Sequence, residues 1–594
     1  MTLLLKLIIN FTLLLQTIIA VSVNPMPAPR NITWDNHGPI AVSASMLLRA
    51  NGGDPVLDAA YQRTVLAIRT LKWIPAAIER PIKSYEPSLG FKPQGVKYTG
   101  PKLQYVRVTI SDWDSVLKLG VNESYSLKVQ KMSNIIEISA ATIWGALHAF
   151  TTLQQIIIYD RNWHTFMIEG PVEIWDEPLF KHRGVLIDTA RNFITKAKML
   201  EQLEVMSIAK MNVLHWHIED SQSWPLELNI YPEMTKDAYS DRDIYTREDV
   251  NEIIQFARQR GIRIVPEIDL PGHARAGWRQ IDEKIVVCGN SWYSNDNLSS
   301  ITAFEAPPGQ IDIIYDKTYE VLNNVFKEIS EIFIDEMIHV GLDEVQENCY
   351  KFSPYISEWL KENISRSYDD LVQYWVDNSL PIFKKYKQKI VMWEDVLLGK
   401  VRAHNVLNNV ILQSWLEDTS NIKKLTSLGY DVIVSSLSHL YLDCGHGGWL
   451  TNDVRYVDAP RNSKFNKYLG GSSCGPYKTW QRIYDFDFLA NLSHTEKLHV
   501  LGGEVALWSE QQDSLTLIQS IWPRTAAFAE SLWSGNRDPS TGFYRTNLAT
   551  QRILNFREYL LALGHDASPL VPKFCLQNPH SCDLFYDQDI YHRY

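Results

Sequence analysis

The chain has 594 residues, enough for two or three domains or for one small domain beside a large barrel. Its hydrophobic content of 45% is ordinary for a globular protein, while 19 tryptophans and 28 tyrosines make it rich in aromatic rings, which both sugar-binding clefts and large cores use. A net charge of −11 argues against nucleic acid and anionic membrane surfaces as partners.

The first 22 residues have the pattern of a secretory signal peptide. Lys6 precedes an apolar run from Leu7 to Val21, which closes with small residues near Ala20. A retained signal anchor is the alternative, although the run is short for a membrane span. No later stretch of the sequence is apolar enough to cross a bilayer. We therefore expect a secreted or extracellular protein, which includes a periplasm, cell wall or vacuolar lumen, with no membrane partner.

Six cysteines in a secreted chain predict three disulfide bonds, for which fifteen connectivities are possible. Cys575 and Cys582 are close enough to close a small loop, and Cys288 with Cys349, and Cys444 with Cys474, would each close a longer one; these are the pairs that we expect. No C-x-x-C motif occurs, and we expect no bound metal. Glycosylation sequons of the form N-x-S/T begin at Asn31, Asn122, Asn297, Asn363 and Asn491.

Residues 23–175 are predicted to form an N-terminal α+β domain. A helix is expected from about Ala141 to Ile157, where apolar residues recur at helical spacing. The segment Gly170–Pro178 is interpreted as a linker. Short alternating strands are expected at 104–110, 125–129 and 134–139.

From residue 176 to 594 the pattern changes to a regular alternation of strands and helices. Strand-like runs lie at 184–189, 213–218, 262–268, 337–341, 390–393, 410–415, 432–435 and 498–507. Helical patterns lie between most of them, for example at 196–210, 247–260, 317–331 and 369–386. This alternation predicts an α/β fold, a (β/α)8 TIM barrel with a C-terminal extension and with insertions near 271–316 and 441–499. A doubly wound open sheet is the alternative, but no glycine-rich phosphate loop supports it.

The expected strand 337–341 is followed by Leu342 and then by two adjacent carboxylates, Asp343 and Glu344. Because two like charges at a strand end repel and resist desolvation, one of them is expected to have a raised pKa, as a general acid needs. Two carboxylates that act on a glycosidic bond from opposite sides lie about 5 Å or more apart. Adjacent residues cannot easily straddle a sugar, so a second protein nucleophile is not expected. Without other reactive residues nearby, such a pair is more often two solvated side chains at the end of a strand.

Most of the other expected strands also end in carboxylate, His, Arg or Trp side chains. In a barrel these ends converge on one face, where active sites lie. The pattern predicts a concave polar site walled by indole rings, suited to a single sugar. The strand ends concerned are 188–191, 215–220, 266–273, 393–395, 413–415, 441–443 and 508–510.

Three motifs resemble glycoside hydrolase family 20, the β-N-acetylhexosaminidases, and the secreted fungal members most closely. They are His-Trp-His (215–217) with Asp220, Pro-Glu-Ile-Asp-Leu-Pro-Gly-His (266–273) and Trp-Pro-Arg (522–524), within a likeness that covers about residues 100–560. The resemblance implies exo-acting, retaining hydrolysis of terminal β-linked N-acetylhexosamine from chitooligosaccharides or glycoconjugates. In this family the 2-acetamido oxygen of the substrate acts as the nucleophile and gives an oxazolinium intermediate, so the usual mechanism with two carboxylates does not apply. The resemblance also implies that no cofactor is needed and that a homodimer can form.

Carried over by motif, the resemblance implies a role for each reactive residue. Glu344 acts as general acid and then as base, and Asp343 orients the acetamido group. Asp220 and His273 form a relay that tunes Glu344. Among substrate-binding residues, Arg191 grips the hydroxyls at the far edge of the ring, where a fork of donors suits vicinal oxygens. The remaining substrate-binding residues are Trp393, Trp415 and Trp508 around the acetamido methyl and the sugar faces, Tyr441 at the acetamido oxygen, Asp443, and Glu510 at a sugar hydroxyl.

Leu342 departs from the family pattern, which usually has a second glycine before the acid pair. An isobutyl group at this position is expected to crowd the barrel interior or to shift the backbone. A non-catalytic sugar-binding homologue, which kept the pocket and lost turnover, is therefore one alternative function.

A metal-dependent amidohydrolase barrel is the other alternative, because His215 and His217 alternate on one strand. That superfamily places the motif on its first strand, whereas here the expected strand 184–189 precedes it. Histidines that hydrogen-bond to their neighbours in the core are the favoured interpretation.

Overall fold

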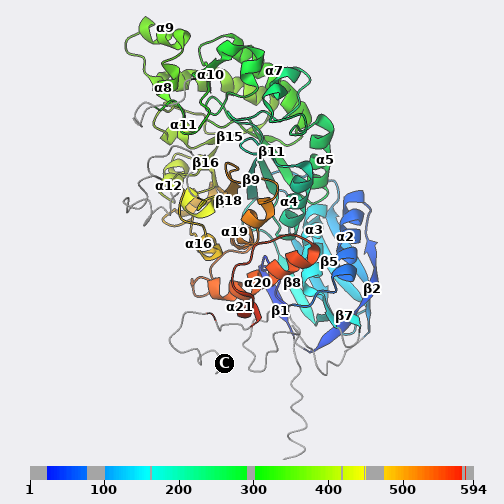
Figure 1. The fold of residues 1–594 in the computed structure, drawn as a ribbon. Coiled ribbons are helices and arrows are strands. Elements are labelled where there is room, and N and C mark those ends of the chain that lie inside the picture. The colour runs from blue at the N-terminus through cyan, green and yellow to red at the C-terminus, as the bar shows by residue number, and fades with distance from the viewer. Residues whose placement is uncertain are drawn as a thin grey trace, which may run out of the picture.

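The computed structural model describes residues 23–35, 37–75, 101–160, 164–290, 301–416, 419–446, 449, 474–577 and 582. The expected signal peptide (1–22) and the sequon at Asn297 lie outside these ranges. The described chain forms an N-terminal sheet with its helices and a closed barrel (Figure 1). Of the helices in these ranges, none is long and apolar enough to cross a membrane. The sequon residues Asn31, Asn122, Asn363 and Asn491 are exposed.

The N-terminal domain is built on an eight-stranded sheet with the strand order β1-β8-β4-β5-β3-β2-β7-β6. Two helices, α2 (Pro55–Leu71) and α3 (Ile143–Ile156), contact each other, α2 against β2 and α3 against β5. The strands are β1 (Asn31–Trp34), β2 (Pro39–Ala50), β3 (Leu103–Asp112), β4 (Tyr125–Val129), β5 (Ile135–Thr142), β6 (Ile158–Asp160), β7 (Thr165–Glu169) and β8 (Val172–Asp176).

The linker expected at Gly170–Pro178 was a wrong interpretation, because this segment contains β8. This strand pairs antiparallel with β1 and with β4 and buries Val172, Ile174 and Asp176 on one face. Its short length and the preceding Gly-Pro hid the alternating pattern. The helix α2 and the strands β1, β2, β6 and β7 were also not foreseen, whereas β3, β4, β5 and α3 lie where they were expected.

The second unit is a closed barrel of parallel strands, in which the last strand pairs with the first. Each of the eight predicted strand runs corresponds to one barrel strand, so the predicted fold class is confirmed. The strands are β9 (His182–Asp188), β10 (Val213–His217), β11 (Arg263–Glu267), β14 (Met337–His339), β15 (Lys389–Trp393), β16 (Ile411–Ser414), β17 (Asp431–Val434) and β18 (Val500–Leu507).

Helices connect the barrel strands, and shorter elements lie in the insertions. The main helices are α4 (Lys196–Ile208), α5 (Arg247–Arg258), α7 (Lys317–Ile332), α10 (Tyr368–Tyr386), α12 (Ser420–Ser427), α17 (His494–Leu498) and α19 (Arg524–Trp533). The insertions and the C-terminal extension add η2 (Pro232–Asp237), α6 (Trp278–Ile281), η3 (Glu283–Ile285), β12 (Val286–Val287), β13 (Gln310–Ile311), α8 (Glu347–Tyr350), α9 (Pro354–Glu362), α11 (Asp395–Leu398), α13 (Leu437–Leu440), α16 (Trp480–Tyr484), α18 (Leu517–Ile521), α20 (Thr546–Leu563) and α21 (Lys573–Gln577).

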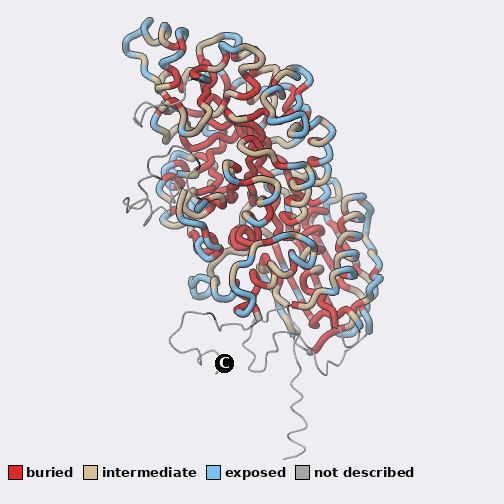
Figure 2. The backbone as a smooth tube through the Cα atoms, in the orientation of Figure 1, coloured by how far each residue is buried: buried red, intermediate tan, exposed pale blue. Residues whose placement is uncertain are grey.

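The barrel strands are buried on both faces, as strands of an all-parallel sheet surrounded by helices must be. Every residue of β9, β10, β11, β14 and β18 is buried. Figure 2 shows this buried region running through the centre of the barrel and a second one through the N-terminal sheet. Polar residues at the strand ends are therefore held by a rigid scaffold.

The two units are joined by buried aromatic and charged contacts. Trp533, at the end of α19, belongs to the core of the N-terminal domain, and its indole donates to Asp176 Oδ1 at 2.8 Å. Lys210 Nζ lies 2.8 Å from Asp176 Oδ2, and Arg183 Nη2 lies 2.6 Å from Glu123 Oε1. Because these buried charges are paired, the contact is specific and costly to break.

Three disulfide bonds are present, and they join the pairs expected from the sequence. They are Cys288–Cys349, Cys444–Cys474 and Cys575–Cys582. The first connects the end of the strand β12, in the insertion after β11, with α8, which follows the acid pair. It therefore ties together two segments that border the candidate site.

Candidate active site

The barrel brings the reactive side chains predicted from the sequence to one end of the strands. Arg191 follows β9, Asp220 follows β10 and His273 follows β11, while Asp343 and Glu344 follow β14. Parallel strands in a closed barrel all point the same way, so these five side chains come from neighbouring strand ends and face one another.

The turn that carries the acid pair has an unusual backbone. Gly341, Leu342 and Glu344 have φ angles of 69°, 81° and 49°. A Cβ on Gly341 would lie 1.7 Å from Asp269 Oδ1, so only glycine fits there. Leu342 lies in the same turn, with a side chain that is 1% exposed and packs in the main core. Its backbone adopts a conformation that favours glycine, so this residue affects the backbone as the sequence suggested.

Asp343 is a buried carboxyl group with a raised pKa. Burial, helped by the negative charge of Glu344 and opposed by His273, raises the pKa of Asp343 to about 6. Its Oδ1 is buried and receives no hydrogen bond from an N–H group of the described residues, while the carboxyl group of Asp269, whose pKa burial and Asp343 raise, interacts with that of Asp343. A buried acceptor of this kind can accept a hydrogen bond from an N–H group of a ligand.

His273 connects Asp220 with the acid pair. Its Nδ1 lies 3.3 Å from Asp220 Oδ1, and its Nε2 lies 3.3 Å from Glu344 Oε2 and 3.7 Å from Asp343 Oδ2. Burial alone would lower the pKa of His273, but Asp220 and the acid pair raise it well above its usual value. Burial would raise the pKa of Asp220, but Arg191 and His273 hold it well below its usual range. The ring is thus a cation held between carboxylates.

Arg191 is anchored on two sides and contacts an acid that the sequence analysis did not single out. Its Nη1 lies 3.3 Å from Asp188 Oδ2, and its Nη2 lies 2.9 Å from Asp220 Oδ2 and 2.5 Å from Glu305 Oε1. The guanidinium also lies 5.1 Å from the ring centre of Trp508. Glu305 comes from the long insertion after β11, where no periodic pattern points to a function.

The four predicted aromatic residues of the pocket form one cluster. Trp393 and Tyr441 are buried in it, with Trp415 and Trp508 packed against them. The rings of Trp415 and Tyr441 are stacked, with centroids 6.1 Å apart, and those of Trp393 and Trp508 lie 6.2 Å apart. Trp415 donates its indole N–H to Asp395 Oδ2 at 2.7 Å. The strand ends therefore supply a continuous aromatic wall.

Two predicted acids near this wall have raised pKa values. Burial raises the pKa of Asp443 to about 7, and its Oδ1 is buried without a hydrogen-bond partner among the described residues. Burial and the charge of Glu305 raise the pKa of Glu510 well above its usual value. Asp395, which lies at a predicted strand end of the site but was given no role, has its pKa raised to about 8 by burial and by Asp343. Such shifts are common in active sites.

A hollow opens between the acid residues of the site and the segment 302–310. Asp220, His273 and Glu344 line one side of it, and Phe304 and Glu305 line the other. Trp508 connects the aromatic wall with these acid residues. Its ring centre lies 5.0 Å from that of His217, which contacts Asp220.

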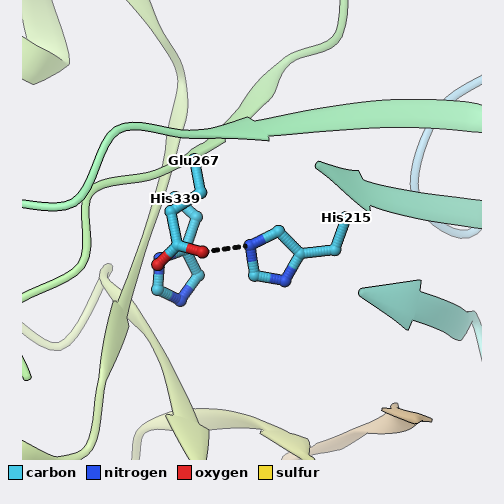
Figure 3. A group of neighbouring side chains, drawn as sticks. All are labelled: His215, Glu267 and His339. Carbon is cyan, nitrogen blue, oxygen red and sulfur yellow. Dashed lines mark ion pairs between the residues drawn. The ribbon is translucent and has the colours of Figure 1, made fainter. Parts of the chain in front are cut away.

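The histidines on the barrel strands pair with carboxylates below the site. His215 and Glu267 point toward one another, with Nε2 and Oε2 3.0 Å apart, and His339 lies beside the carboxylate (Figure 3). These three residues could be taken for a metal site. Burial lowers the pKa of His215, but Glu504 and Glu267 together raise it to about 9. Because a metal ligand must be a neutral imidazole, the arrangement fits an ion-pair network better than the metal centre of an amidohydrolase.

A closed parallel barrel with an acid pair, an arginine and an aromatic wall at its strand ends defines a glycoside hydrolase. Comparison of the sequence with protein-family models identifies the particular family of glycoside hydrolases. The model described as "Glycosyl hydrolase family 20, catalytic domain" matches residues 180–536, and that described as "beta-acetyl hexosaminidase like" matches residues 25–156. The chain therefore belongs to glycosyl hydrolase family 20.

Individual proteins agree with this assignment. The chain is 50% identical to a β-hexosaminidase of Emericella nidulans over 591 residues, which cover 97% of this chain and 98% of that protein. It is 32% identical to a chitooligosaccharidolytic β-N-acetylglucosaminidase of Ostrinia furnacalis, over 82% of this chain and 79% of that protein. The fold resembles that of the chitobiase of Flavobacterium johnsoniae, with a TM-score of 0.70 and 24% identity over 94% of this chain and 75% of that one. The chain is thus an exo-acting enzyme of the β-N-acetylhexosaminidase family that acts on oligosaccharides, as the sequence motifs implied.

Proposed function

We propose that the enzyme removes terminal non-reducing β-linked N-acetylhexosamine with retention at the anomeric carbon, by substrate assistance. Glu344 protonates the glycosidic oxygen while the acetamido oxygen of the substrate attacks the anomeric carbon. The glycosidic bond breaks, and an oxazolinium ion forms. Glu344 then removes a proton from the water that opens this ion, and the acetamido group is restored.

The observation that carries this proposal is the position of His273 Nε2 between the two acids, 3.3 Å from Glu344 Oε2 and 3.7 Å from Asp343 Oδ2. The two carboxyl groups therefore flank one ring nitrogen, and they are carried by adjacent residues of the turn after β14. A retaining enzyme with a protein nucleophile needs its second carboxylate across the sugar ring. Adjacent residues of one turn are poorly placed to straddle a sugar, which supports a nucleophile supplied by the substrate.

Asp343 has the properties needed to hold an acetamido group. Its buried Oδ1, which receives no N–H from the described residues, can accept the acetamido N–H, and its negative charge stabilises the positive charge that develops on the ring. We assign Arg191 to the hydroxyls at the far edge of the sugar, and the aromatic cluster of Trp393, Trp415, Tyr441 and Trp508 to the acetamido methyl and the sugar faces. Asp443 and Glu510 complete the set as acceptors for sugar hydroxyls.

The name of the Ostrinia relative suggests a substrate class for this chain. We propose chitooligosaccharides as substrates, with N-glycans and other glycoconjugates as the second class. Secretion and a homodimer are also proposed. The leading apolar segment and the three disulfide bonds support a secretory route.

Hydrolysis of p-nitrophenyl β-N-acetylglucosaminide by the full-length purified enzyme, followed by proton NMR, tests the proposal. The first product should be the β-anomer, whereas the α-anomer would exclude substrate assistance. Glu344→Gln keeps the shape of the site but cannot donate the proton, so turnover should fall by about 10²–10⁴-fold with the affinity for N-acetylglucosamine retained. Glu347→Gln, three residues further along in α8, is the control and should leave turnover unchanged.

A further inference from the structure

Glu267, the last residue of β11, is fully buried and has no role in the reaction above. Its Oε1 accepts a hydrogen bond from the indole N–H of Trp393 at 2.8 Å. Its Oε2 lies 2.7 Å from Nδ1 of His217. One carboxylate therefore contacts the aromatic wall through one oxygen and the histidine network through the other.

His217 continues this contact toward the catalytic acid. Its Nε2 lies 3.1 Å from Asp220 Oδ2, so both ring nitrogens face carboxylates and both must carry a proton. Burial lowers the pKa of His217, but Glu267 and Asp220 raise it well above its usual value. Since Asp220 also holds His273 beside Glu344, an unbroken series of charged contacts runs from Glu267 to the general acid.

Two further histidines face the carboxylate of Glu267. His215 Nε2 lies 3.0 Å from Oε2, and His339 Nδ1 lies 2.9 Å from Oε1, so each carboxylate oxygen faces a histidine (Figure 3). Burial by itself would raise the pKa of Glu267, but the three histidines hold it well below its usual range. The charged groups that face His217 are Glu267 from β11, Asp269 from the segment after β11, Asp188 from β9, and Glu219 and Asp220 from the segment after β10.

We propose that Glu267 is a positioning residue for both halves of the site. Through Oε2 it fixes the ring of His217. His217 in turn holds Asp220, and Asp220 holds His273 in place beside Glu344. Through Oε1 it fixes the indole of Trp393 in the pocket wall. This inference rests on the proposed roles of Glu344 and His273.

Glu267→Gln separates the two contacts. The amide oxygen can still accept the Trp393 N–H, but the amide nitrogen then faces His217 Nδ1, which loses its acceptor. We expect kcat to fall by about 10–100-fold, the usual cost of losing a group that orients a functional histidine, with KM changed by less than about threefold. The acid limb of the kcat/KM profile should move to lower pH, because the charge of Glu267 helps to raise the pKa of Asp343.

A double-mutant cycle with Asp220→Asn shows whether Glu267 acts through Asp220. If it does, Glu267→Gln lowers kcat strongly in the wild-type background and by less than about threefold in the Asp220→Asn background. Glu530→Gln is the matched control, because Glu530 is fully buried and paired with Arg552 but lies on α19, away from the site. It should lower the melting temperature without changing kcat, KM or the pH profile.

Equal losses from Glu267→Gln in both backgrounds, or an unchanged pH profile, would overturn this inference while the wild-type enzyme remains active. The same shift in the pH profile for Glu530→Gln would show that loss of any buried charge produces it, and would overturn the inference too. An inactive wild-type enzyme, or full turnover by Glu344→Gln, would instead refute the proposed function. The two failures are therefore distinguishable.

Discussion

Nε2 of His273 lies 3.3 Å from Oε2 of Glu344, and both residues have a positive φ, 46° and 49°. Non-glycine residues rarely adopt this conformation, and each instance costs about 1–3 kcal/mol. Together with Leu342 at 81°, three such residues lie at neighbouring strand ends. The rigid barrel holds the three residues in this conformation. The strain lowers the stability of the fold and keeps the general acid in its position.

The first prediction concerns the pH dependence of activity. Asp343 must be ionised to stabilise the oxazolinium ion, and its pKa is raised to about 6. We expect kcat/KM to fall as the pH falls through about 6, since the protonated form accumulates there. Steady-state kinetics between pH 4 and 8 measure this limb. A profile that stays flat down to about pH 4.5 would contradict the assignment.

The second prediction concerns stability and uses the same group. The unfolded chain has an Asp pKa of about 3.9, whereas the folded value is about 6. Between these values the folded state still binds a proton that the unfolded state has lost, so rising pH destabilises the fold until Asp343 is fully ionised. Asp343→Asn removes this penalty.

The melting temperature of Asp343→Asn should therefore exceed that of the wild type above pH 6, and the difference should shrink toward pH 4. Differential scanning calorimetry at several pH values measures it. The variant should also lose turnover, because the amide cannot stabilise the positive intermediate. A melting-temperature difference that is the same at every pH would show that packing, and not ionisation, causes it.

The sequence was sufficient for the barrel and for much of its site, because both depend on local patterns. Buried parallel strands are apolar runs, and residues directly after them, such as Asp220 and His273, must lie at one face. Other features depend on tertiary structure. Glu305 reaches Arg191 from an insertion without periodicity, and β8 is too short to show its alternation. No propensity predicts that Leu342 adopts a positive φ, since only the turn around Gly341 imposes it.

The third prediction concerns the disulfide bond between Cys288, after β12, and Cys349 in α8, the helix that directly follows Gln346 in the lining of the hollow. Its sequence separation of 61 residues corresponds to a stabilisation of about 4 kcal/mol in the chain-entropy model. The double variant Cys288→Ser/Cys349→Ser should melt at a lower temperature and be cleaved faster by protease within 301–309. Its KM should rise because the pocket wall is less well held. The matched double variant at Cys575 and Cys582 should leave KM unchanged.

The fourth prediction concerns metals. Carboxylates raise the pKa of His215 to about 9 and that of His217 well above its usual value, so a metal ion would have to displace a proton to bind either ring. Dialysis against EDTA should therefore change kcat/KM by less than about twofold, because these ion pairs remain intact without a metal. Loss of activity that added zinc restores would refute this and would revive the amidohydrolase interpretation.

The last prediction concerns Leu342, whose side chain is 1% exposed and whose φ is 81°. Deleting a buried leucine side chain typically costs about 2–5 kcal/mol, but glycine at this φ recovers about 1–2 kcal/mol of backbone strain. Leu342→Ala opens nearly the same cavity and keeps the strain. At most sites alanine is more stable than glycine; here we expect Leu342→Gly to be more stable than Leu342→Ala by about 1 kcal/mol, measured by urea unfolding. We also expect turnover of Leu342→Gly close to that of the wild type, because Asp343 and Glu344 already lie beside His273. A large gain in turnover would show instead that the leucine holds the acid pair out of place.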